Sequence, residues 1–358
     1  MNDRWVRTLL CSSSAAVLLA AASSTPGVTA ERPRCFGRVA TIVGTPDTDV
    51  LTGTRGPDVI VGGASRDEIR SRGGDDYICG GEGPDSIVSG FGDDRVRGGR
   101  DFNRINAGPG KDLLIGGPGP DEIAGFEGKD RLVGGGSSDN LDGGSGDDVI
   151  VGGADDGIGD IAGYDVAPRG IRIDLSKGRA SGHGSDTLRG LESVWGSPYD
   201  DVILGDAGPN ALLGGLGDDL MRGREGDDCL APIFGENDVY GGAGTDTYGA
   251  QRSGCSPDAP DWAIAAGVQV DLSKGTATQP DEVSRLFGIE SAIGTFEGDV
   301  LTGDDDPNLL VGLYGDDSIA GGAGDDTLDG DQGTDTLSGN DGVDDCRDGE
   351  VVTACESP

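Results

Sequence analysis

The sequence predicts an all-β solenoid in which short strands stack coil upon coil. Three observations support this prediction: a nine-residue period, one large aliphatic residue in each period, and a composition rich in glycine. The 358 residues include 69 glycines, and only 4% of the chain is aromatic. A compact core of ordinary composition is hard to build from such a chain, which is therefore either disordered or ordered by a repeat.

The N-terminal residues 1–30 are typical of a secretory signal peptide. Arg4 and Arg7 precede a run of small and apolar residues, and the small residues Val28 and Ala30 flank Thr29 before Glu31. A basic start, a short apolar stretch and a small-residue cleavage site describe an export signal. The apolar run is too short and too rich in Ser and Ala for a transmembrane span. We therefore expect a secreted, extracellular protein without a membrane span.

From Thr45 to Gly152 the chain divides into twelve consecutive segments of nine residues. The fifth position is Asp in eleven of them, the exception being Asn103, and the seventh is Ile, Leu or Val in all twelve. Such phase coherence excludes disorder and indicates a repeat architecture.

The same frame returns twice, each time after a longer irregular unit. GIRIDLSKGRA at 170–180 matches GVQVDLSKGTA at 267–277, so the two halves are a duplication. Alternating aliphatic residues in these units, such as Ile171, Ile173 and Leu175, predict strands there. The predicted order is a signal peptide at 1–30, an N-terminal cap at 31–44, nonapeptide block 1 at 45–152, an irregular β linker at 153–196, block 2 at 197–250, a second linker at 251–294, block 3 at 295–345 and a C-terminal cap at 346–358.

Within one segment the two parts favour different backbones. The glycine-rich part favours a turn, because glycine tolerates positive φ and lets one backbone approach another. The next three residues, such as Val59, Ile60 and Val61, favour a short strand whose middle residue points inward. One aliphatic residue in nine is too little core for an isolated unit, so coils of two segments must stack to form an aliphatic ladder.

This stacking would arrange the fifth-position aspartates in two rows. Neighbouring strands lie about 4.8 Å apart, and like charges at that distance repel by about 0.8 kcal/mol per pair in water. A hard divalent cation taking carboxylate and turn carbonyl oxygens would remove this repulsion, and Ca2+ suits flexible glycine loops better than Mg2+. The candidate metal ligands are Asp49, Asp58, Asp67, Asp76, Asp85, Asp94, Asp112, Asp121, Asp130, Asp139, Asp148, Asp201, Asp219, Asp228, Asp246, Asp299, Asp317, Asp326 and Asp335.

The segments resemble the calcium-binding nonapeptide of repeats-in-toxin (hemolysin-type) proteins, G-G-x-G-x-D-x-U-x. GGPGPDEIA at 116–124, GGSGDDVIV at 143–151 and GGAGDDTLD at 321–329 fit every fixed position. The resemblance implies a right-handed parallel β-roll that holds calcium in its turns and folds as calcium binds. GRDFNRINA at 99–107 departs from the motif, so a weak or absent site is expected there. Asparagine also replaces the carboxylate at Asn210, Asn237 and Asn308.

The net charge of −38 and the single histidine exclude several functions. DNA, RNA and anionic membrane surfaces are unlikely partners of so acidic a chain, because phosphate binding requires the opposite sign. A three-histidine zinc site cannot be built, and His183 is expected to be an ordinary loop residue. Calcium ions are therefore the expected partner.

Six cysteines remain after the predicted cleavage, an even number that suits an oxidising compartment. They allow fifteen pairings. Proximity favours Cys346–Cys355 and Cys229–Cys255, which leaves Cys35–Cys79. A metal–thiolate site is the alternative, although the chain contains no C-x-x-C.

The sequence thus predicts a secreted, non-enzymatic β-roll whose activity is calcium binding. Two alternatives remain: a calcium-stabilised structural or adhesive solenoid, and a β-helix polysaccharide lyase. The lyase would require an aspartate-bound Ca2+ and an arginine base in one cleft, whereas the calcium motifs run evenly along the chain. A serine hydrolase is disfavoured because the sequence has no G-x-S-x-G.

Overall fold

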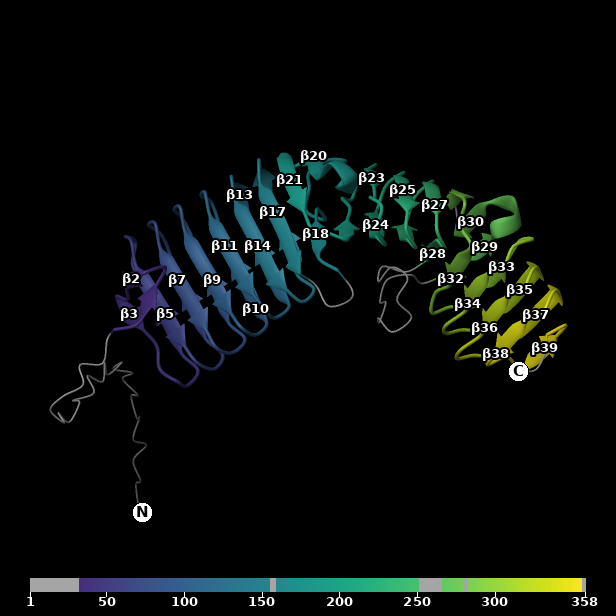
Figure 1. Ribbon diagram of the computed structural model, residues 1–358, viewed down its shortest axis with the longest axis horizontal. Helices are drawn as coiled ribbons and strands as arrows, with labels where there is room; N and C mark the ends of the chain where they lie inside the picture. The colour runs from purple at the N-terminus through teal and green to yellow at the C-terminus, as the bar shows by residue number, and fades with distance from the viewer. Residues whose placement is uncertain (1–31, 155–158, 251–265, 280–281, 356–358) are drawn as a thin grey trace, which may run out of the picture. The chain divides into compact units, whose positions relative to one another are not determined.

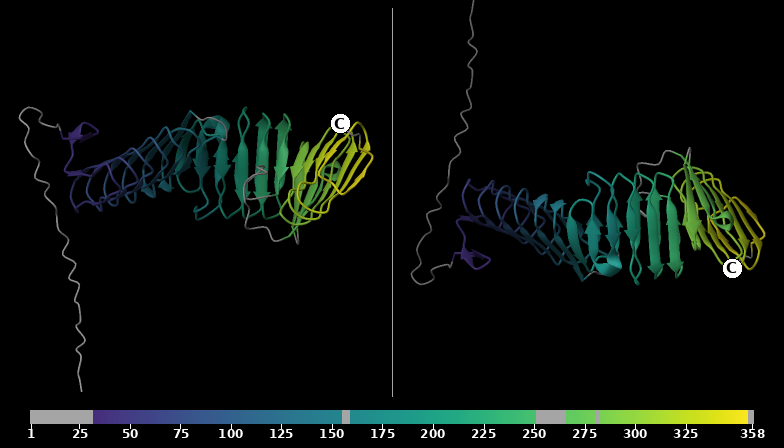
Figure 2. Two further views of the ribbon diagram at one scale, coloured as in Figure 1. Left: turned by 90° about the horizontal axis from the view of Figure 1, so that it is seen from below. Right: turned by 90° about the horizontal axis from the view of Figure 1, so that it is seen from above.

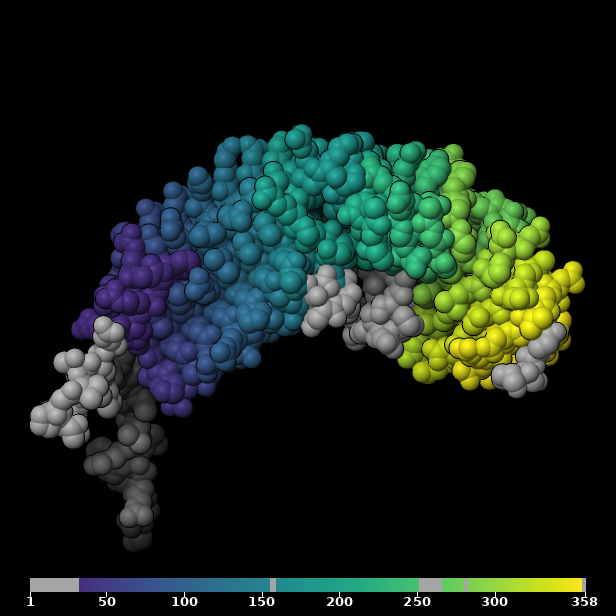
Figure 3. Space-filling model, in the orientation of Figure 1, coloured from purple at the N-terminus to yellow at the C-terminus, as the bar shows by residue number. Residues whose placement is uncertain are grey.

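The computed structural model describes residues 32–154, 159–250, 266–279 and 282–355. The predicted signal peptide lies outside the described residues. Within the unit Pro33–Pro358, each coil contributes one strand to each of two facing parallel sheets (Figures 1 and 2). The coils follow one another in chain order, as the continuous change of colour shows (Figure 3). The predicted parallel β-solenoid is confirmed.

The first sheet has fifteen parallel strands, each coming one coil after its neighbour. Most are only three residues long, because a nine-residue segment leaves room for little more than a turn and a short strand. In order they are β4 (Val50–Thr52), β6 (Glu68–Arg70), β8 (Ser86–Val88), β10 (Asn103–Asn106), β12 (Asp121–Ala124), β15 (Asn140–Asp142), β18 (Ile161–Gly163), β22 (Ser193–Trp195), β24 (Ala211–Gly215), β26 (Cys229–Ile233), β28 (Thr247–Gly249), β32 (Ser291–Ile293), β34 (Leu309–Val311), β36 (Thr327–Asp329) and β38 (Asp345–Arg347).

The second sheet has twenty strands, whose pairings form an open series from β3 to β39. It is parallel except where two hairpins enter it. In spatial order its strands are β3 (Ile42–Val43), β5 (Val59–Gly63), β7 (Tyr77–Gly81), β9 (Arg95–Gly99), β11 (Leu113–Gly117), β14 (Arg131–Gly136), β17 (Val149–Ala154), β21 (Ser185–Arg189), β20 (Arg179–Ser181), β19 (Arg172–Asp174), β23 (Val202–Leu204), β25 (Leu220–Glu225), β27 (Asp238–Ala243), β31 (Glu282–Phe287), β30 (Thr276–Gln279), β29 (Gln269–Asp271), β33 (Val300–Thr302), β35 (Ser318–Ala323), β37 (Thr336–Asp341) and β39 (Val351–Thr353).

The strand register confirms two segments per coil. Ile60 lies opposite Ile78, eighteen residues later, and Ile78 lies opposite Val96. These seventh-position residues point between the sheets and are fully buried. A ladder of identical contacts therefore forms the core, which explains how one aliphatic residue per segment suffices. The same position is buried in every later coil, from Leu114 through Met221 to Leu337.

Turns stack closely enough that some glycines cannot be replaced. Gly74 has φ +105°, and a Cβ there would lie 2.5 Å from the carbonyl carbon of Gly56 in the preceding coil. Both the close approach of the neighbouring coil and the positive φ of Gly74 therefore require glycine at this position. The short strands β13 (Glu127–Gly128) and β16 (Ser145–Gly146) pair in parallel between two such turns.

The two irregular units form matching hairpins that enter the second sheet. In the first unit β19 pairs with β20 and β20 with β21, all antiparallel, while β21 and β19 pair in parallel with the flanking coils. β29, β30 and β31 repeat this arrangement. Each hairpin contains a 3-10 turn, η1 (Leu175–Lys177) or η2 (Leu272–Lys274), ending at a left-handed glycine.

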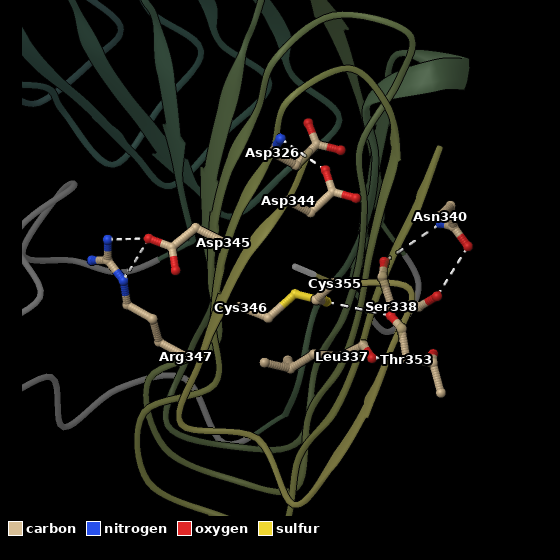
Figure 4. Close-up of a disulfide and its surroundings, with 10 residues drawn as sticks. All are labelled: Asp326, Leu337, Ser338, Asn340, Asp344, Asp345, Cys346, Arg347, Thr353 and Cys355. Atoms are coloured by element: carbon tan, nitrogen blue, oxygen red, sulfur yellow. Dashed lines mark hydrogen bonds and ion pairs between the residues drawn. A yellow bond between two sulfur atoms is a disulfide. The ribbon is translucent and has the colours of Figure 1, made fainter. Parts of the chain in front are cut away.

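Both ends of the described chain are tied by disulfides. The antiparallel hairpin β1 (Arg34–Cys35) and β2 (Arg38–Val39) is joined to β7 by Cys35–Cys79. Cys346–Cys355 joins the last strand of the first sheet to the chain end (Figure 4). Both pairings confirm the prediction, whereas Cys229–Cys255 involves Cys255, which lies outside the described residues.

Helical structure is confined to these two 3-10 turns over the described ranges. No helix there is long and apolar enough to cross a membrane.

Candidate metal sites in the turns

The fifth-position aspartates line the two sides of the solenoid as predicted, and the structure shows what holds each one. The backbone N–H of Asp67 donates to Oδ1 of Asp85, one coil later, at 2.8 Å. On the opposite side the N–H of Asp112 donates to Oδ1 of Asp130 at the same distance. This contact recurs from coil to coil, so each aspartate both donates along its row and accepts from it. Figure 4 shows the contact between Asp326 and Asp344.

Two rows result, and both continue through the linkers. The first row precedes the strands of the fifteen-strand sheet and comprises Asp49, Asp67, Asp85, Asn103, Asp121, Asp139, Asp160 and Glu192, then Asn210, Asp228, Asp246 and Glu290, then Asn308, Asp326 and Asp344. The second row lies before or near the start of the strands of the other sheet and comprises Asp58, Asp76, Asp94, Asp112, Asp130, Asp148 and Asp186, then Asp201, Asp219, Asn237 and Ser284, then Asp299, Asp317, Asp335 and Glu350.

The other carboxylate oxygen, Oδ2, accepts no hydrogen bond from any described residue at fifteen of the nineteen predicted ligands. Each of these side chains is at most 3% exposed, so water is excluded from it as well. A buried charged oxygen without a partner is strongly unfavourable, which makes these atoms the clearest indication of a cation. The fifteen are Asp67, Asp76, Asp85, Asp94, Asp112, Asp121, Asp130, Asp139, Asp148, Asp219, Asp228, Asp246, Asp317, Asp326 and Asp335.

A glycine stands five residues before twelve of these fifteen aspartates and leaves room next to Oδ2, whereas Ser71, Ser89 and Ala107 stand there before Asp76, Asp94 and Asp112. A Cβ on Gly116 would be 2.2 Å from Oδ2 of Asp121 and 2.8 Å from the carbonyl oxygen of Gly134, one coil later. Gly80 stands in the same relation to Asp85 and to the carbonyl oxygen of Gly98. At Gly116 and at Gly80, one carboxylate oxygen and one carbonyl oxygen thus border a space that the glycine keeps open.

Four predicted ligands differ, because their own turn satisfies Oδ2. In the first coil Thr54 donates to Oδ2 of Asp58 from its backbone N–H at 2.7 Å and from its hydroxyl at 3.0 Å. Thr45 holds Asp49, Ser197 holds Asp201 and Thr295 holds Asp299 through the same backbone bond. All four lie at the start of a block, where Thr or Ser stands at the first position of the segment. These turns are complete without a cation.

Where asparagine replaces the aspartate, its side chain likewise forms hydrogen bonds within the protein. Asn103 directs its Nδ2 toward Gly98, where the aspartates direct Oδ2, and this nitrogen donates to Oδ1 of Asp121 and to the carbonyl of Asp101. Asn210 accepts from the backbone N–H of Asp206, and Asn308 from that of Asp304. The weak or absent site expected at 99–107 stays a prediction, which this arrangement of Asn103 supports.

The prediction missed several acidic residues that extend the rows. Asp160, Asp186 and Asp344 occupy row positions, and Glu192, Glu290 and Glu350 accept the last N–H of a row segment. A signal for Asp186 was present, because Asp186-Thr187-Leu188-Arg189-Gly190 repeats the D-T-L-x-G of block 3. Tyr164, which is buried, donates its hydroxyl to Oδ2 of Asp186 at 3.0 Å, so a tyrosine completes this row position.

Burial changes the protonation of the rows in the metal-free chain. Desolvation raises the pKa of Asp85 and of Asp139 from 3.8 to about 7, against the opposing effect of the backbone hydrogen bond. The same cause raises the pKa of Asp219 to about 9. Neighbouring aspartates of the row add a Coulombic contribution in the same direction. Protons and a cation therefore compete for these carboxylates.

We expect the calcium-free chain to lose stability as pH rises from about 4 to above 7. The folded pKa values exceed the unfolded value, so the folded chain binds more protons in this range and stability falls with pH. Far-UV circular dichroism in EDTA at pH 5 and pH 8 would test this, with saturating calcium as the control, and the β signal should be larger at pH 5. An equal β signal at the two pH values without calcium would contradict it.

The available donors are those that a hard cation prefers. Carboxylate and carbonyl oxygens border the spaces, which fits Ca2+ rather than a thiolate- or imidazole-binding metal. Over the described ranges, no three His, Cys, Asp or Glu side chains converge on one point. A bound ion would therefore combine row carboxylates with backbone carbonyls of successive turns.

Comparison with known proteins agrees with this geometry. The family model described as "RTX calcium-binding nonapeptide repeat (4 copies)" matches residues 43–78, 52–87, 88–123, 124–158, 195–228, 293–328, 302–337 and 311–346, which together exceed half of the chain. No curated protein matches the chain.

Proposed function

Because the chain belongs to the RTX calcium-binding nonapeptide repeat family, we propose that it is a secreted β-roll that binds many Ca2+ ions in its stacked turns and folds as it binds them. The observation that carries the proposal is the set of fifteen buried aspartates whose Oδ2 atoms accept no hydrogen bond from the described residues. Fifteen is also the number of sites we propose for these ligands. The four aspartates held by Thr or Ser at the block starts are left out.

Electrostatic repulsion explains why binding and folding would be coupled. Within a row, successive carboxylates belong to strands about 4.8 Å apart, and their repulsion exceeds the value in water because the side chains are buried. Summed along two rows, this repulsion is comparable with the net stability of a domain. A cation at each turn would convert it into attraction. Because the unfolded chain has no preformed site, the binding free energy would become folding free energy.

Calcium fits these turns better than magnesium. Ca2+ accepts six to eight oxygen ligands in flexible geometry, whereas Mg2+ demands a near-ideal octahedron and retains its water. The glycine turns present oxygens on a backbone without bulky side chains, and the spaces repeat with the coil rather than forming separate cages. The ion would supply positive charge and fixed coordination, and we assign it no catalytic step.

Location outside the cell is supported by the cysteines and by the predicted signal peptide. The bonds Cys35–Cys79 and Cys346–Cys355 require an oxidising compartment, and extracellular fluids provide one. Export would then deliver an expanded chain into a calcium-rich medium, where it would fold.

The decisive test is a calcium titration of the full chain, followed by far-UV circular dichroism and by equilibrium dialysis with radioactive calcium. We expect a cooperative gain of β signal, its reversal by EDTA, a poor response to Mg2+ and about fifteen bound ions. A spectrum already folded in EDTA and unchanged by calcium would reduce the aspartates to structural acids and favour a metal-free structural solenoid.

A further inference from the structure

Four arginines lie on the outer face of the twenty-strand sheet around the first linker hairpin. Arg131 is on β14, Arg172 on β19, Arg179 on β20 and Arg189 on β21. β14, β17, β21, β20 and β19 are successive neighbours in the sheet, and Figure 1 labels the first four of them. We call these four residues the arginine face.

Strand register brings the four residues together. Arg131 lies opposite Val149, Val149 opposite Thr187, and Thr187 opposite Arg179. Arg131 and Arg179 therefore occupy one row, three strand spacings or about 14 Å apart. Arg189 and Arg172 lie on the same outer face, on opposite sides of this row. Arg189 is two positions beyond Thr187, and Arg172 lies opposite Ser181, which lies opposite Ser185, two positions before Thr187. Residues distant in sequence thus form one positively charged surface.

The arginine face is unusual in so acidic a chain. All four side chains are exposed, and within the described ranges none takes part in an ion pair or a ring contact. Acidic residues outnumber basic ones by 65 to 27, and Arg70 and Arg104 do pair with glutamates on the other sheet. Because these four arginines form no ion pair within the described ranges, their guanidinium groups are free to bind a ligand.

A depression of about 450 Å³ opens within this surface. Its lining combines Arg172, Lys177 and Arg179 with the hydroxyls of Ser181, Ser185 and Thr187. Two carboxylates also line the depression, and each already has a partner within the protein. Asp174 pairs with Lys177 at 2.6 Å and with Arg224 at 3.0 Å, and Asp186 is buried and accepts the Tyr164 hydroxyl. The free donors are therefore two guanidinium groups and three hydroxyls.

We propose that the arginine face and this depression bind an acidic polysaccharide. The guanidinium groups would take its carboxylate or sulfate groups, because arginine donates in pairs to planar or tetrahedral oxyanions. The hydroxyls of Ser181, Ser185 and Thr187 match the hydroxyls of the sugars. Nucleic acid fits less well, because duplex DNA carries one charge about every 1.7 Å and would be repelled by the acidic turns on both sides. A glycan with charges spaced by whole sugars avoids much of that repulsion.

This proposal rests on the proposed function, because calcium controls the surface in two ways. The four arginines come from strands separated by up to 58 positions, 131 to 189, and they assemble only when the coils stack. Fifteen bound calcium ions would also offset most of the net charge of −38, and so weaken the field that repels an anionic ligand. Glycan binding should therefore require calcium although the glycan contacts arginine.

The test measures binding of fluorescently labelled chondroitin sulfate to the full chain in saturating calcium, with uncharged dextran and duplex DNA as further probes. The variant replaces Arg131, Arg172, Arg179 and Arg189 with Gln. The matched control replaces Arg55, Arg66, Arg70 and Arg104 with Gln, which are exposed and lie in turns or on the other sheet. We expect the first variant to weaken binding by about tenfold or more and the control by less than about threefold. Binding should also weaken as salt rises.

Circular dichroism of each variant during the same calcium titration separates the two proposals. If the chain fails to fold with calcium, the proposed function is wrong. If both variants fold normally but bind chondroitin sulfate equally, or if the wild-type chain does not bind it, the arginine face is not the site. Equal or tighter binding of the DNA would overturn the choice of an acidic polysaccharide.

Discussion

Replacing Asp130 and Asp148 with Asn should raise the calcium concentration at the folding midpoint by about tenfold or more. Asn keeps the Oδ1 atom that accepts the N–H from the preceding coil, so the row contact survives. What changes is Oδ2, which becomes an amide nitrogen that cannot bind a cation. A loss of about 1.4 kcal/mol corresponds to a tenfold change in an equilibrium constant, and two neighbouring sites are affected. A calcium titration followed by far-UV circular dichroism measures the shift.

The matched control is the double replacement of Asp75 and Asp93 with Asn. These residues have the same side chain, lie in the turns of the same row and are exposed. Their Oδ1 atoms accept backbone N–H groups from the next coil, which Asn preserves. The control removes the same charge, so a simple surface-charge effect would shift both titrations equally. That outcome would show that the buried row does not hold the ions.

Gly116→Ala should destabilise the calcium-loaded chain by about 1–3 kcal/mol. The new Cβ would lie 2.2 Å from Oδ2 of Asp121 and 2.8 Å from the carbonyl oxygen of Gly134. It would therefore fill the space between two oxygens that we propose as ligands. Gly116 does not have a positive φ, so the effect would come from the filled space rather than from backbone strain. Urea unfolding at saturating calcium measures the loss.

Gly56→Ala is the control for this substitution. Its Cβ would meet only the Thr54 hydroxyl at 4.0 Å, and Gly56 also lacks a positive φ. It belongs to the turn of Asp58, which Thr54 already satisfies. We expect a change within about 0.5 kcal/mol. If both alanines cost the same, the glycine beside Oδ2 would have no special role.

The expected differences between each variant and its control arise because the aspartates of the repeat fall into two structural groups. Aspartates that look alike in the repeat divide into those held by the hydroxyl and N–H of a Thr or Ser in their own turn and those with an Oδ2 atom that no described group contacts. The first group stands at the start of each block. Each block would then begin with coils that are complete without calcium and could serve as a surface on which the calcium-dependent coils stack.

Much of this molecule follows from local pattern. The nine-residue period places an aliphatic residue such as Ile60 or Leu114 inside every coil, and the strand register of eighteen residues follows from two segments per coil. Cys346–Cys355 also follows from the sequence, because its cysteines are only nine residues apart, whereas Cys35–Cys79, 44 residues apart, followed only as the pair left by the other two assignments.

Other features depend on contacts between residues distant in the sequence. The antiparallel entry of β20 between β19 and β21 could not be read from the linker, because alternation predicts a strand but not its partner or direction. Asp186 carries a local D-T-L-x-G signal, but its partner in the row is Asp148, 38 residues earlier, and only the stacked coils identify that partner. The arginine face is a consequence of that hairpin.

The sequence by itself determined the solenoid, its period and the residue types of the candidate calcium sites, because a repeat imposes the same local preferences in every segment. Only the tertiary structure decided which aspartates are left without a protein partner and where four arginines meet. Both depend on what the next coil or the inserted hairpin brings within hydrogen-bonding reach, and no single segment contains that information.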